Sequence, residues 1–192
     1  MIKTVGVIGA GTMGNGIAQV FAQSGFSVTL VDVAPPVLDR ARASIEKSLA
    51  KFVDKGKLTA SDRDATMARL STATAVDRLA GADYVVEAIV EDAAAKCALF
   101  AALDAIVSPD VILASNTSSI SITVLGAATR RPDKVLGMHF MNPVPLMTLV
   151  ETIRGQATSA ARRPRASPRT PTARTPGRFR CPSCLRRRRR LF

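Results

Sequence analysis

The sequence predicts an α/β fold of the Rossmann type, a doubly wound parallel sheet, and three observations support this prediction. Short apolar, β-branched runs alternate with segments whose apolar residues recur at helical spacing. The first apolar run ends in a glycine-rich turn at residues 9–14, and the second run closes on Asp32. Strands that alternate with helices pair in parallel through right-handed crossovers, so we expect helices on both faces of the sheet.

The first half of the chain supplies four or five elements of this fold. Residues 2–8 form an apolar run typical of a buried parallel strand, and residues 28–33 form a second. Between them, residues 13–22 carry apolar side chains at helical spacing. A longer amphipathic helix is expected at residues 35–52. The polar segment 54–70 then fits the second arm of a helical hairpin.

The same alternation continues in the second half of the chain. Strand-like runs occur at residues 84–89, 111–114 and 134–140. Helices are predicted between them at residues 93–106 and at about residues 122–128. The pattern therefore predicts one folded α/β unit that extends to about residue 158.

Charge is distributed unevenly along the 192 residues. The net charge is +12 at pH 7, yet residues 1–159 contain 15 basic and 15 acidic side chains. Residues 160–192 contain 12 Arg, five Pro and no acidic residue. Such a composition cannot bury enough apolar surface to fold, so we expect residues 159–192 to form a disordered basic tail. No apolar run is long enough to span a membrane and no signal pattern is present, so a cytoplasmic location is the default expectation.

Two features of the tail allow a functional interpretation. The five arginines at residues 186–190 are able to contact nucleic-acid phosphates, but no aromatic residues are interleaved with them. Cys181 and Cys184 form a single CxxC pair, and a zinc site needs two further ligands that this region lacks. We therefore expect no metal site and no specific nucleic-acid partner.

The glycine turn has the pattern GxGxxG and lies between a strand and a helix. Gly9 permits a tight turn, Gly11 lets the backbone approach a pyrophosphate, and Gly14 lets the helix pack closely on the strand. The first backbone N–H groups of the helix, around Thr12 and Met13, then face the phosphates. The turn predicts a dinucleotide site, although a glycine turn that only links strand to helix remains the alternative.

Asp32 lies 18 residues beyond Gly14, where the second strand ends. A carboxylate at this place accepts hydrogen bonds from the adenine-ribose hydroxyls and repels a 2′-phosphate. The sequence therefore predicts NAD, rather than NADP, as the cofactor.

Four motifs in order resemble the L-3-hydroxyacyl-CoA dehydrogenase family, and within it the short bacterial 3-hydroxybutyryl-CoA dehydrogenases. The motifs occupy residues 7–18, 87–92, 115–119 and 137–143. The resemblance covers about residues 1–158, which we expect to form the NAD-binding domain. It implies oxidation of an L-3-hydroxyacyl-CoA to the 3-ketoacyl-CoA, with hydride transfer to NAD, in fatty-acid or short-chain acyl-CoA metabolism.

The resemblance also implies catalytic roles for four residues. His139, the single histidine of the chain, matches the catalytic base, and imidazole ionises near neutrality, which suits this role. Glu151 matches the carboxylate that orients the histidine, and a turn after Asn142 would place the two on adjacent strands. Ser118 matches a residue that contacts the substrate hydroxyl and lies near the nicotinamide. Asn142 matches a residue that polarises the substrate carbonyl and helps to hold the cofactor.

Further positions match contacts with the cofactor and with coenzyme A. Glu91 and Lys96 match contacts beside the nicotinamide ribose. Ser48 and Lys55 match positions that contact coenzyme A, and a cation at Lys55 suits its phosphates. For Ser48 and Lys55, a solvated helix face is nearly as good an interpretation.

The catalytic positions also have structural interpretations. His139 could be a core histidine with satisfied hydrogen bonds, and Glu151 could pair with Arg154 on the surface. Ser118 and Asn116 could cap the helix that follows them.

The chain departs from the family after residue 158. The family continues with a helical C-terminal domain that lines the acyl-CoA cleft and forms most of the homodimer interface. Here an Ala, Arg and Pro-rich segment follows instead, and we interpret it as the product of a reading-frame shift in a GC-rich gene. The functional hypotheses are an NAD-dependent dehydrogenase, an NAD-binding fragment with impaired catalysis, and, least favoured, a basic nucleic-acid-binding protein. Dimerisation is in doubt without that domain.

Overall fold

The computed structural model describes residues 2–159 of the chain. The sequence predictions for the tail beyond Ser159, including the CxxC pair at Cys181 and Cys184 and the arginines at 186–190, lie outside the described residues. The boundary between domain and tail therefore stays a prediction.

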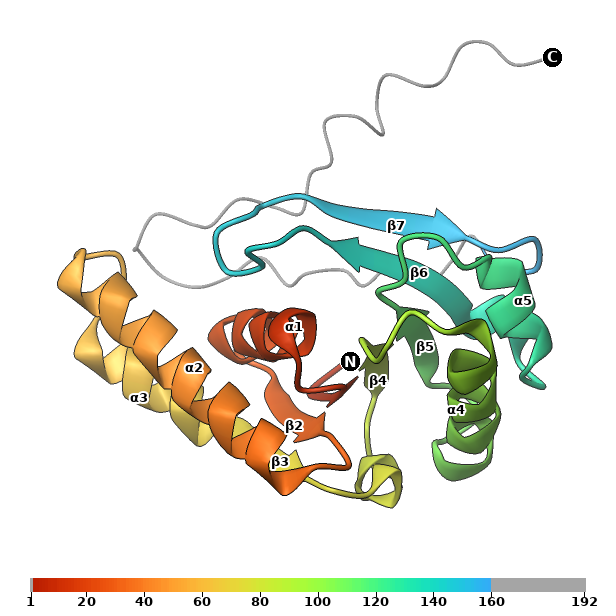
Figure 1. Cartoon of the computed structure of the whole chain (residues 1–192), viewed down its shortest axis with the longest axis horizontal. Helices are drawn as coiled ribbons and strands as arrows, with labels where there is room; N and C mark the ends of the chain where they lie inside the picture. Colours follow the sequence, from red (N-terminus) through yellow and green to blue (C-terminus); the bar gives the residue numbers. More distant parts are fainter. Residues whose placement is uncertain (1, 160–192) are drawn as a thin grey trace, which may run out of the picture.

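One sheet of seven strands, in the order β3-β2-β1-β4-β5-β6-β7, runs through the molecule (Figure 1). The strands are β1 (Thr4–Ile8), β2 (Ser27–Val31), β3 (Leu70–Ala73), β4 (Tyr84–Glu87), β5 (Ile112–Ser115), β6 (Val135–Phe140) and β7 (Val150–Arg154). The pairs from β3 through to β6 are parallel, whereas β6 and β7 pair antiparallel. The predicted fold class is therefore confirmed.

Helices cover both faces of this sheet. They are α1 (Thr12–Gln23), α2 (Pro35–Asp54), α3 (Ala60–Ala68), α4 (Ala93–Ile106) and α5 (Ile122–Ala127), with short 3₁₀ turns at Val76–Leu79 and Pro132–Lys134. α1, α2 and α3 pack against one another, and α4 contacts α5 on the other face (Figure 1). Each layer has its own apolar core, one built on α1 and α2 and the other on α4 and α5.

Two strands differ from the pattern that the sequence predicts. β3 is absent from the expected elements because it is a four-residue edge strand with two exposed positions, so it carries no apolar run. β7 departs from the expected parallel arrangement. Residues 141–149 join it to β6, and so short a connection permits a hairpin but no crossover helix.

The sheet topology determines where a ligand can lie. β1 and β4 are neighbours, and the chain proceeds from β1 towards β3 on one side and from β4 towards β7 on the other. Ligands of doubly wound sheets bind at this switch point, outside the carboxyl ends of the strands. The glycine turn follows β1 and Asp32 follows β2, so both lie at that edge.

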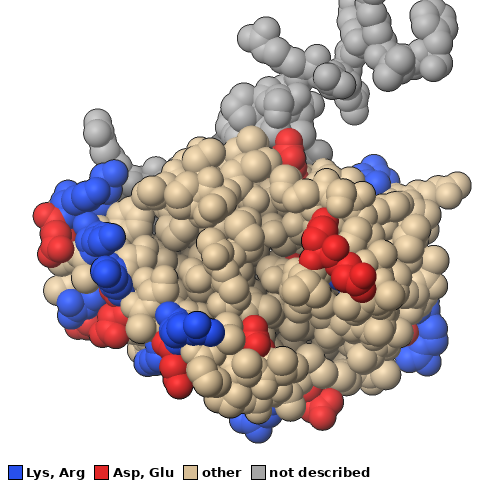
Figure 2. Space-filling view, viewed as in Figure 1, with Lys and Arg blue, Asp and Glu red and all other residues tan. Residues whose placement is uncertain are grey.

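The surface of the described residues carries charges of both signs. Basic and acidic side chains lie side by side over α2 and α3, whereas the middle of the same face is mostly uncharged (Figure 2). The helices within residues 2–159 are too short or too polar to span a lipid bilayer.

An ion cluster around the buried side chains of Asp104 and Arg131 joins α4 to the segment before β6, and the third member, Arg130, is exposed. Asp104 is 5% exposed and accepts hydrogen bonds from Arg130 Nε at 2.9 Å and from Arg131 Nε, whose side chain is 8% exposed. Burial raises the pKa of Asp104, but the bonds from Arg130 and Arg131 outweigh burial and lower the pKa below its ordinary value. The stability that Asp104 contributes is therefore present at neutral pH and is lost as the pH falls through the lowered pKa.

We predict that Asp104→Asn lowers the free energy of unfolding by about 3 kcal/mol or more, because it leaves the buried guanidinium of Arg131 without a counter-ion. The matched control is Asp110→Asn. Asp110 pairs with Lys134 at 2.7 Å, but its side chain is 83% exposed, so a loss below about 1 kcal/mol is expected. Urea denaturation measures both values, and equal losses would contradict the assignment.

Candidate functional site

The glycine turn after β1 leaves open space where a ligand can approach the backbone. Gly9 has a φ of 94°, in the region that favours glycine. A Cβ on Gly14 would lie 1.6 Å from the carbonyl oxygen of Gly9, so only glycine fits there. A Cβ on Gly11 would meet nothing within 4 Å. The turn therefore packs tightly on its protein side and is open on the side of Gly11.

The start of α1 offers donors to an anion. Its N-cap residue is Gly11, which has no side chain that could cap the helix, and no acidic residue lies in the first turn. The first N–H groups of a helix, here around Thr12 and Met13, have no partner within the helix. Backbone donors and a positive dipole end suit a phosphate, so these residues fit the pyrophosphate of a dinucleotide.

Asp32 lies beside this turn and helps to hold it. Its Oδ2 accepts a hydrogen bond from Ala10 N at 2.8 Å, and its Oδ1 accepts one from Ala34 N at 3.1 Å. A carboxylate oxygen can accept a second hydrogen bond. Asp32 therefore fits the hydroxyls of a ribose while it stays anchored to the backbone.

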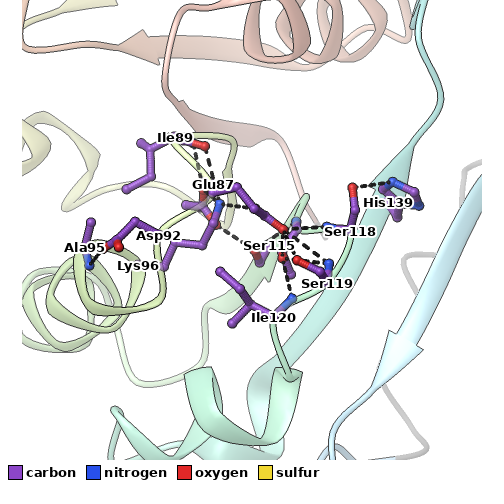
Figure 3. A network of polar contacts seen from close by, with 12 residues as sticks. Glu87, Ile89, Asp92, Ala95, Lys96, Ser115, Ser118, Ser119, Ile120 and His139 are labelled. Carbon is purple, nitrogen blue, oxygen red and sulfur yellow. Dashed lines mark hydrogen bonds and ion pairs between the residues drawn. The ribbon is translucent and has the colours of Figure 1, made fainter.

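A buried ion pair lies at the carboxyl end of β4 (Figure 3). The side chains of Glu87 and Lys96 are 0% and 1% exposed and pair directly. The carboxylate of Glu87 also accepts hydrogen bonds from Ser115 Oγ at 2.6 Å and from Ile89 N at 2.7 Å. Lys96 lies near the start of α4, where the helix dipole disfavours a cation. Its pairing with carboxylates offsets that cost.

Glu91 connects this pair to the serine-rich segment after β5. Its Oε2 lies 3.4 Å from Lys96 Nζ, and its Oε1 accepts bonds from Thr117 Oγ1, Ser118 N at 3.0 Å and Ser119 N at 3.2 Å. Burial raises the pKa of Glu91, but the bonds from Thr117, Ser118 and Ser119 and the charge of Lys96 lower it to about 2. Glu91 is therefore an ionised anchor for the loop that carries Ser118.

His139 lies between Ser118 and Glu151. In the antiparallel register of β6 and β7, His139 is directly opposite Glu151, and its Nδ1 lies 3.2 Å from Glu151 Oε2. Because a carboxylate only accepts, Nδ1 carries the hydrogen, and Nε2 presents a lone pair to Ser118 Oγ at 3.1 Å (Figure 3). A cleft of about 400 Å³ opens at this place, lined by residues 117–123 with His139, Glu151, Ile153 and Arg154. The site can therefore take a proton from a group bound beside Ser118.

Other predicted site residues lie apart from this cluster. Asn142 is exposed at the start of the loop after β6, next to a cis bond to Pro143. Ser48 is half-buried in α2, and Lys55 is exposed just beyond it. Among the described residues, no hydrogen bond or ion pair joins Asn142, Ser48 or Lys55 to His139.

The structure also decides between structural interpretations. Ser121 is the N-cap of α5, so the capping interpretation of Ser118 and Asn116 is wrong. Arg154 donates to Thr158 O at 2.8 Å, whereas Glu151 contacts His139. The surface pairing of Glu151 with Arg154 is therefore not what the structure shows.

Sequence reasoning assigned no role to Glu87, Ser115 or Thr117, although each belongs to the network that holds Glu91 and Ser118. One signal was available. An acidic residue that ends an otherwise apolar buried strand, followed nine positions later by a lysine within an apolar helix, indicates a buried pair. Ser115 and Thr117 gave no such signal, because their partners are defined only in three dimensions.

We predict that alanine at Gly14 lowers stability, whereas alanine at Gly11 lowers NADH affinity. Gly14→Ala should cost roughly 3 kcal/mol or more of unfolding free energy, because its Cβ collides with a backbone carbonyl. Gly11→Ala should change the free energy of unfolding by less than about 1 kcal/mol. It should lower NADH affinity by about tenfold or more, which corresponds to about 1.4 kcal/mol. Thermal unfolding and fluorescence titration with NADH measure the two effects. Native NADH affinity in Gly11→Ala would contradict the phosphate site.

We predict that Thr117→Val raises the pKa of Glu91 from about 2 towards its ordinary 4.5, because it removes a hydrogen bond to the charged form. In the native chain, the stability due to Glu91 is complete above pH 4.5 and is lost as the pH falls towards 2. Carboxyl ¹³C NMR measures the titration, with exposed Thr72→Val as the control. An unchanged titration in Thr117→Val would show that the hydroxyl is unimportant.

Comparisons with known proteins agree with this geometry. The family model of the 3-hydroxyacyl-CoA dehydrogenase NAD-binding domain matches residues 4–166. A probable 3-hydroxybutyryl-CoA dehydrogenase of Deinococcus radiodurans is 56% identical over 154 residues, which cover 80% of this chain and 55% of that protein. One of Bacillus subtilis is 49% identical over 158 residues, covering 82% and 55%. The chain thus spans about half the length of these curated relatives.

Solved structures give the same result. A 3-hydroxybutyryl-CoA dehydrogenase from Escherichia coli superposes with a TM-score of 0.82 at 46% identity, covering 83% of this chain and 34% of that one. An (S)-3-hydroxybutyryl-CoA dehydrogenase from Ralstonia eutropha gives 0.81 at 48% identity, covering 83% and 56%. The chain therefore belongs to the 3-hydroxyacyl-CoA dehydrogenase family, and most of its length corresponds to the NAD-binding domain of that family.

Proposed function

We propose that this chain binds NAD and provides the acid–base residues for oxidation of an L-3-hydroxyacyl-CoA, with 3-hydroxybutyryl-CoA as the favoured substrate. One observation carries the proposal. Ser118 Oγ, His139 and Glu151 form a hydrogen-bonded line at the carboxyl edge of the sheet, with distances of 3.1 and 3.2 Å. The same edge carries the glycine turn and Asp32.

The proposed proton transfer starts at the substrate hydroxyl, bound beside Ser118. His139 Nε2 takes the hydroxyl proton, and the electron pair of the O–H bond forms the carbonyl as the C3 hydride leaves. Bound NAD supplies the acceptor of that hydride. Glu151 keeps Nδ1 protonated and stabilises the imidazolium that results. In the reverse direction, the same imidazolium returns the proton.

Binding roles follow from the same placement. In this proposal the pyrophosphate is held by the glycine turn and the start of α1, at residues Gly9, Gly11, Thr12, Met13 and Gly14. The adenine ribose is held by Asp32. In the same proposal, Glu91 and Lys96 contact the cofactor beside the nicotinamide ribose. Asn142, in the β6–β7 loop, polarises the substrate carbonyl and helps to hold the cofactor. For coenzyme A we propose Ser48 and Lys55, whose support is the family resemblance together with the exposed ammonium of Lys55.

The serine–histidine–glutamate line also resembles the triad of serine hydrolases, but its surroundings disfavour that chemistry. An acyl-transfer site needs N–H donors directed at the developing oxyanion. Here the N–H groups of Ser118 and Ser119 donate to Glu91, at 3.0 and 3.2 Å. The charge of Glu91 would repel an oxyanion, so the arrangement supports acid–base chemistry rather than nucleophilic attack by Ser118.

The exposure of the site favours a second candidate function, NAD binding with weak turnover. Ser118 is exposed, and the side chain of Glu151 is 45% exposed. Dehydrogenation proceeds best where water is excluded and the substrate is held in place, and misplacement alone costs about 100-fold in rate. We propose a cytoplasmic location, and we do not extend the homodimer of the family to this chain, because the family forms most of that interface with its helical C-terminal domain.

We predict that the full chain binds NADH and reduces acetoacetyl-CoA slowly, and that His139→Gln lowers this turnover by about 100- to 10,000-fold. NADH affinity should stay near native, because the substitution leaves the glycine turn unchanged. Fluorescence titration measures binding, and the loss of NADH absorbance measures turnover. Ser71→Ala, on the distant edge strand β3, is the control.

The outcomes separate the candidates. NADH binding without turnover in the native chain supports the second candidate. Native turnover in His139→Gln would remove the assignment of His139 as the base, and absence of NADH binding would overturn both candidates.

A further inference from the structure

Asn116 lies in the serine-rich segment, and the proposed function gives it no role. Its backbone N donates to Glu87 O at 2.8 Å, which continues the contact between β4 and β5. Its side-chain Oδ1 accepts a hydrogen bond from Phe140 N at 2.9 Å. One residue thus joins the ends of three neighbouring strands, β4, β5 and β6.

The side-chain bond occurs where the sheet ladder stops. The paired register of β5 and β6 ends at Ser115 and Gly137, while β6 continues to Phe140 with β7 as its partner. Beyond that register, the N–H of Phe140 has no backbone acceptor on β5. Phe140 itself is 3% exposed, so water is a poor substitute. The amide of Asn116 fills the gap as a side-chain extension of the ladder.

Other side chains of the segment bond to β4 and the loop after it, on the side away from β6. Ser115 donates to Glu87, and Thr117 and Ser119 donate to Glu91 (Figure 3). Within residues 2–159, the hydrogen bonds that connect this segment to residues 139–140 are Asn116 to Phe140 and Ser118 to His139. The bond of Asn116 is the one that involves no reacting group.

We propose that Asn116 is a positioning residue, which sets the distance between Ser118 and His139 by fixing the end of β6 against the segment that carries Ser118. This inference rests on the proposed function for its catalytic meaning, but its geometry can be tested without turnover. The hydrogen bond from Phe140 N requires an acceptor oxygen at the distance from the backbone that an Asn or Asp side chain provides. Leucine has a similar size and no acceptor, and serine is too short.

The single histidine makes a direct test possible. In the ¹⁵N-labelled full chain, the Nε2 chemical shift of His139 reports the hydrogen bond from Ser118. We expect Ser118→Ala to change this shift in the native chain and in Asn116→Asp, which keeps the acceptor. In Asn116→Leu and Asn116→Ser, the same substitution should change the shift by less than half as much, because the bond is already lengthened or lost.

Turnover of acetoacetyl-CoA, where it is measurable, should follow the same order. Asn116→Leu is expected to lose up to about 100-fold in turnover at near-native NADH affinity, and Asn116→Asp to retain more of it. Ser71→Ala serves as the matched control, since it removes a side-chain hydrogen bond to Val28 O on a distant strand. It should leave the effect of Ser118→Ala at its native size.

An equal effect of Ser118→Ala in the native, Leu and Ser backgrounds would overturn the proposal, as would the absence of any effect in the native chain. If Asn116→Leu does not fold, the serine variant, which keeps a polar side chain, decides the question. Failure of the proposed function has a different signature. It shows as native turnover in His139→Gln, a result on which the NMR comparison does not depend.

Discussion

The buried carboxylate of Glu87 is the constraint on which the carboxyl edge of the sheet depends. A charge with no exposed surface is stable only when it is paired and hydrogen-bonded. Lys96, Ser115 and Ile89 N satisfy these requirements from α4, from β5 and from the loop after β4. Without Lys96 the buried charge would lose its counter-ion, and without Ser115 one carboxylate oxygen of Glu87 would lose its donor. The loops that carry Glu91 and Ser118 therefore hold fixed positions although their tips are exposed.

The other half of the site comes from a different kind of structure, the hairpin of β6 and β7. There the register places His139 opposite Glu151, and backbone pairing alone brings the two side chains to the same face. A rigid ion network thus holds Ser118, and a hairpin holds the imidazole. The cleft lies where these two units meet. The distance between Ser118 and His139 is therefore fixed only if the two units are held against each other.

Sequence reasoning found the parts of this design that have local signatures. The glycine turn, Asp32 and the alternation of strands and helices depend on short-range patterns, and the fold they predict is the fold observed. The contact between His139 and Glu151 followed from the family resemblance and from a turn between two strands. The bonds of Ser115 and Thr117 to Glu87 and Glu91 were not predicted, because the partners lie up to 28 residues apart in the sequence. Gly16 is a similar case: a Cβ there would lie 2.7 Å from Val144, so it lets the β6–β7 loop dock on α1.

The charges of the site suit a reaction that moves positive charge without creating it. Glu91 and Glu151 are partly exposed carboxylates near the reacting groups, and Lys96 is held by Glu87 and Glu91. Hydride transfer would remove one positive charge from an oxidised nicotinamide, while His139 would gain one with the proton. Glu151, whose Oε2 lies 3.2 Å from His139 Nδ1, would stabilise the imidazolium that results. Because the same imidazolium can return the proton to the substrate, one arrangement of Ser118, His139 and Glu151 can serve both directions of the proposed reaction.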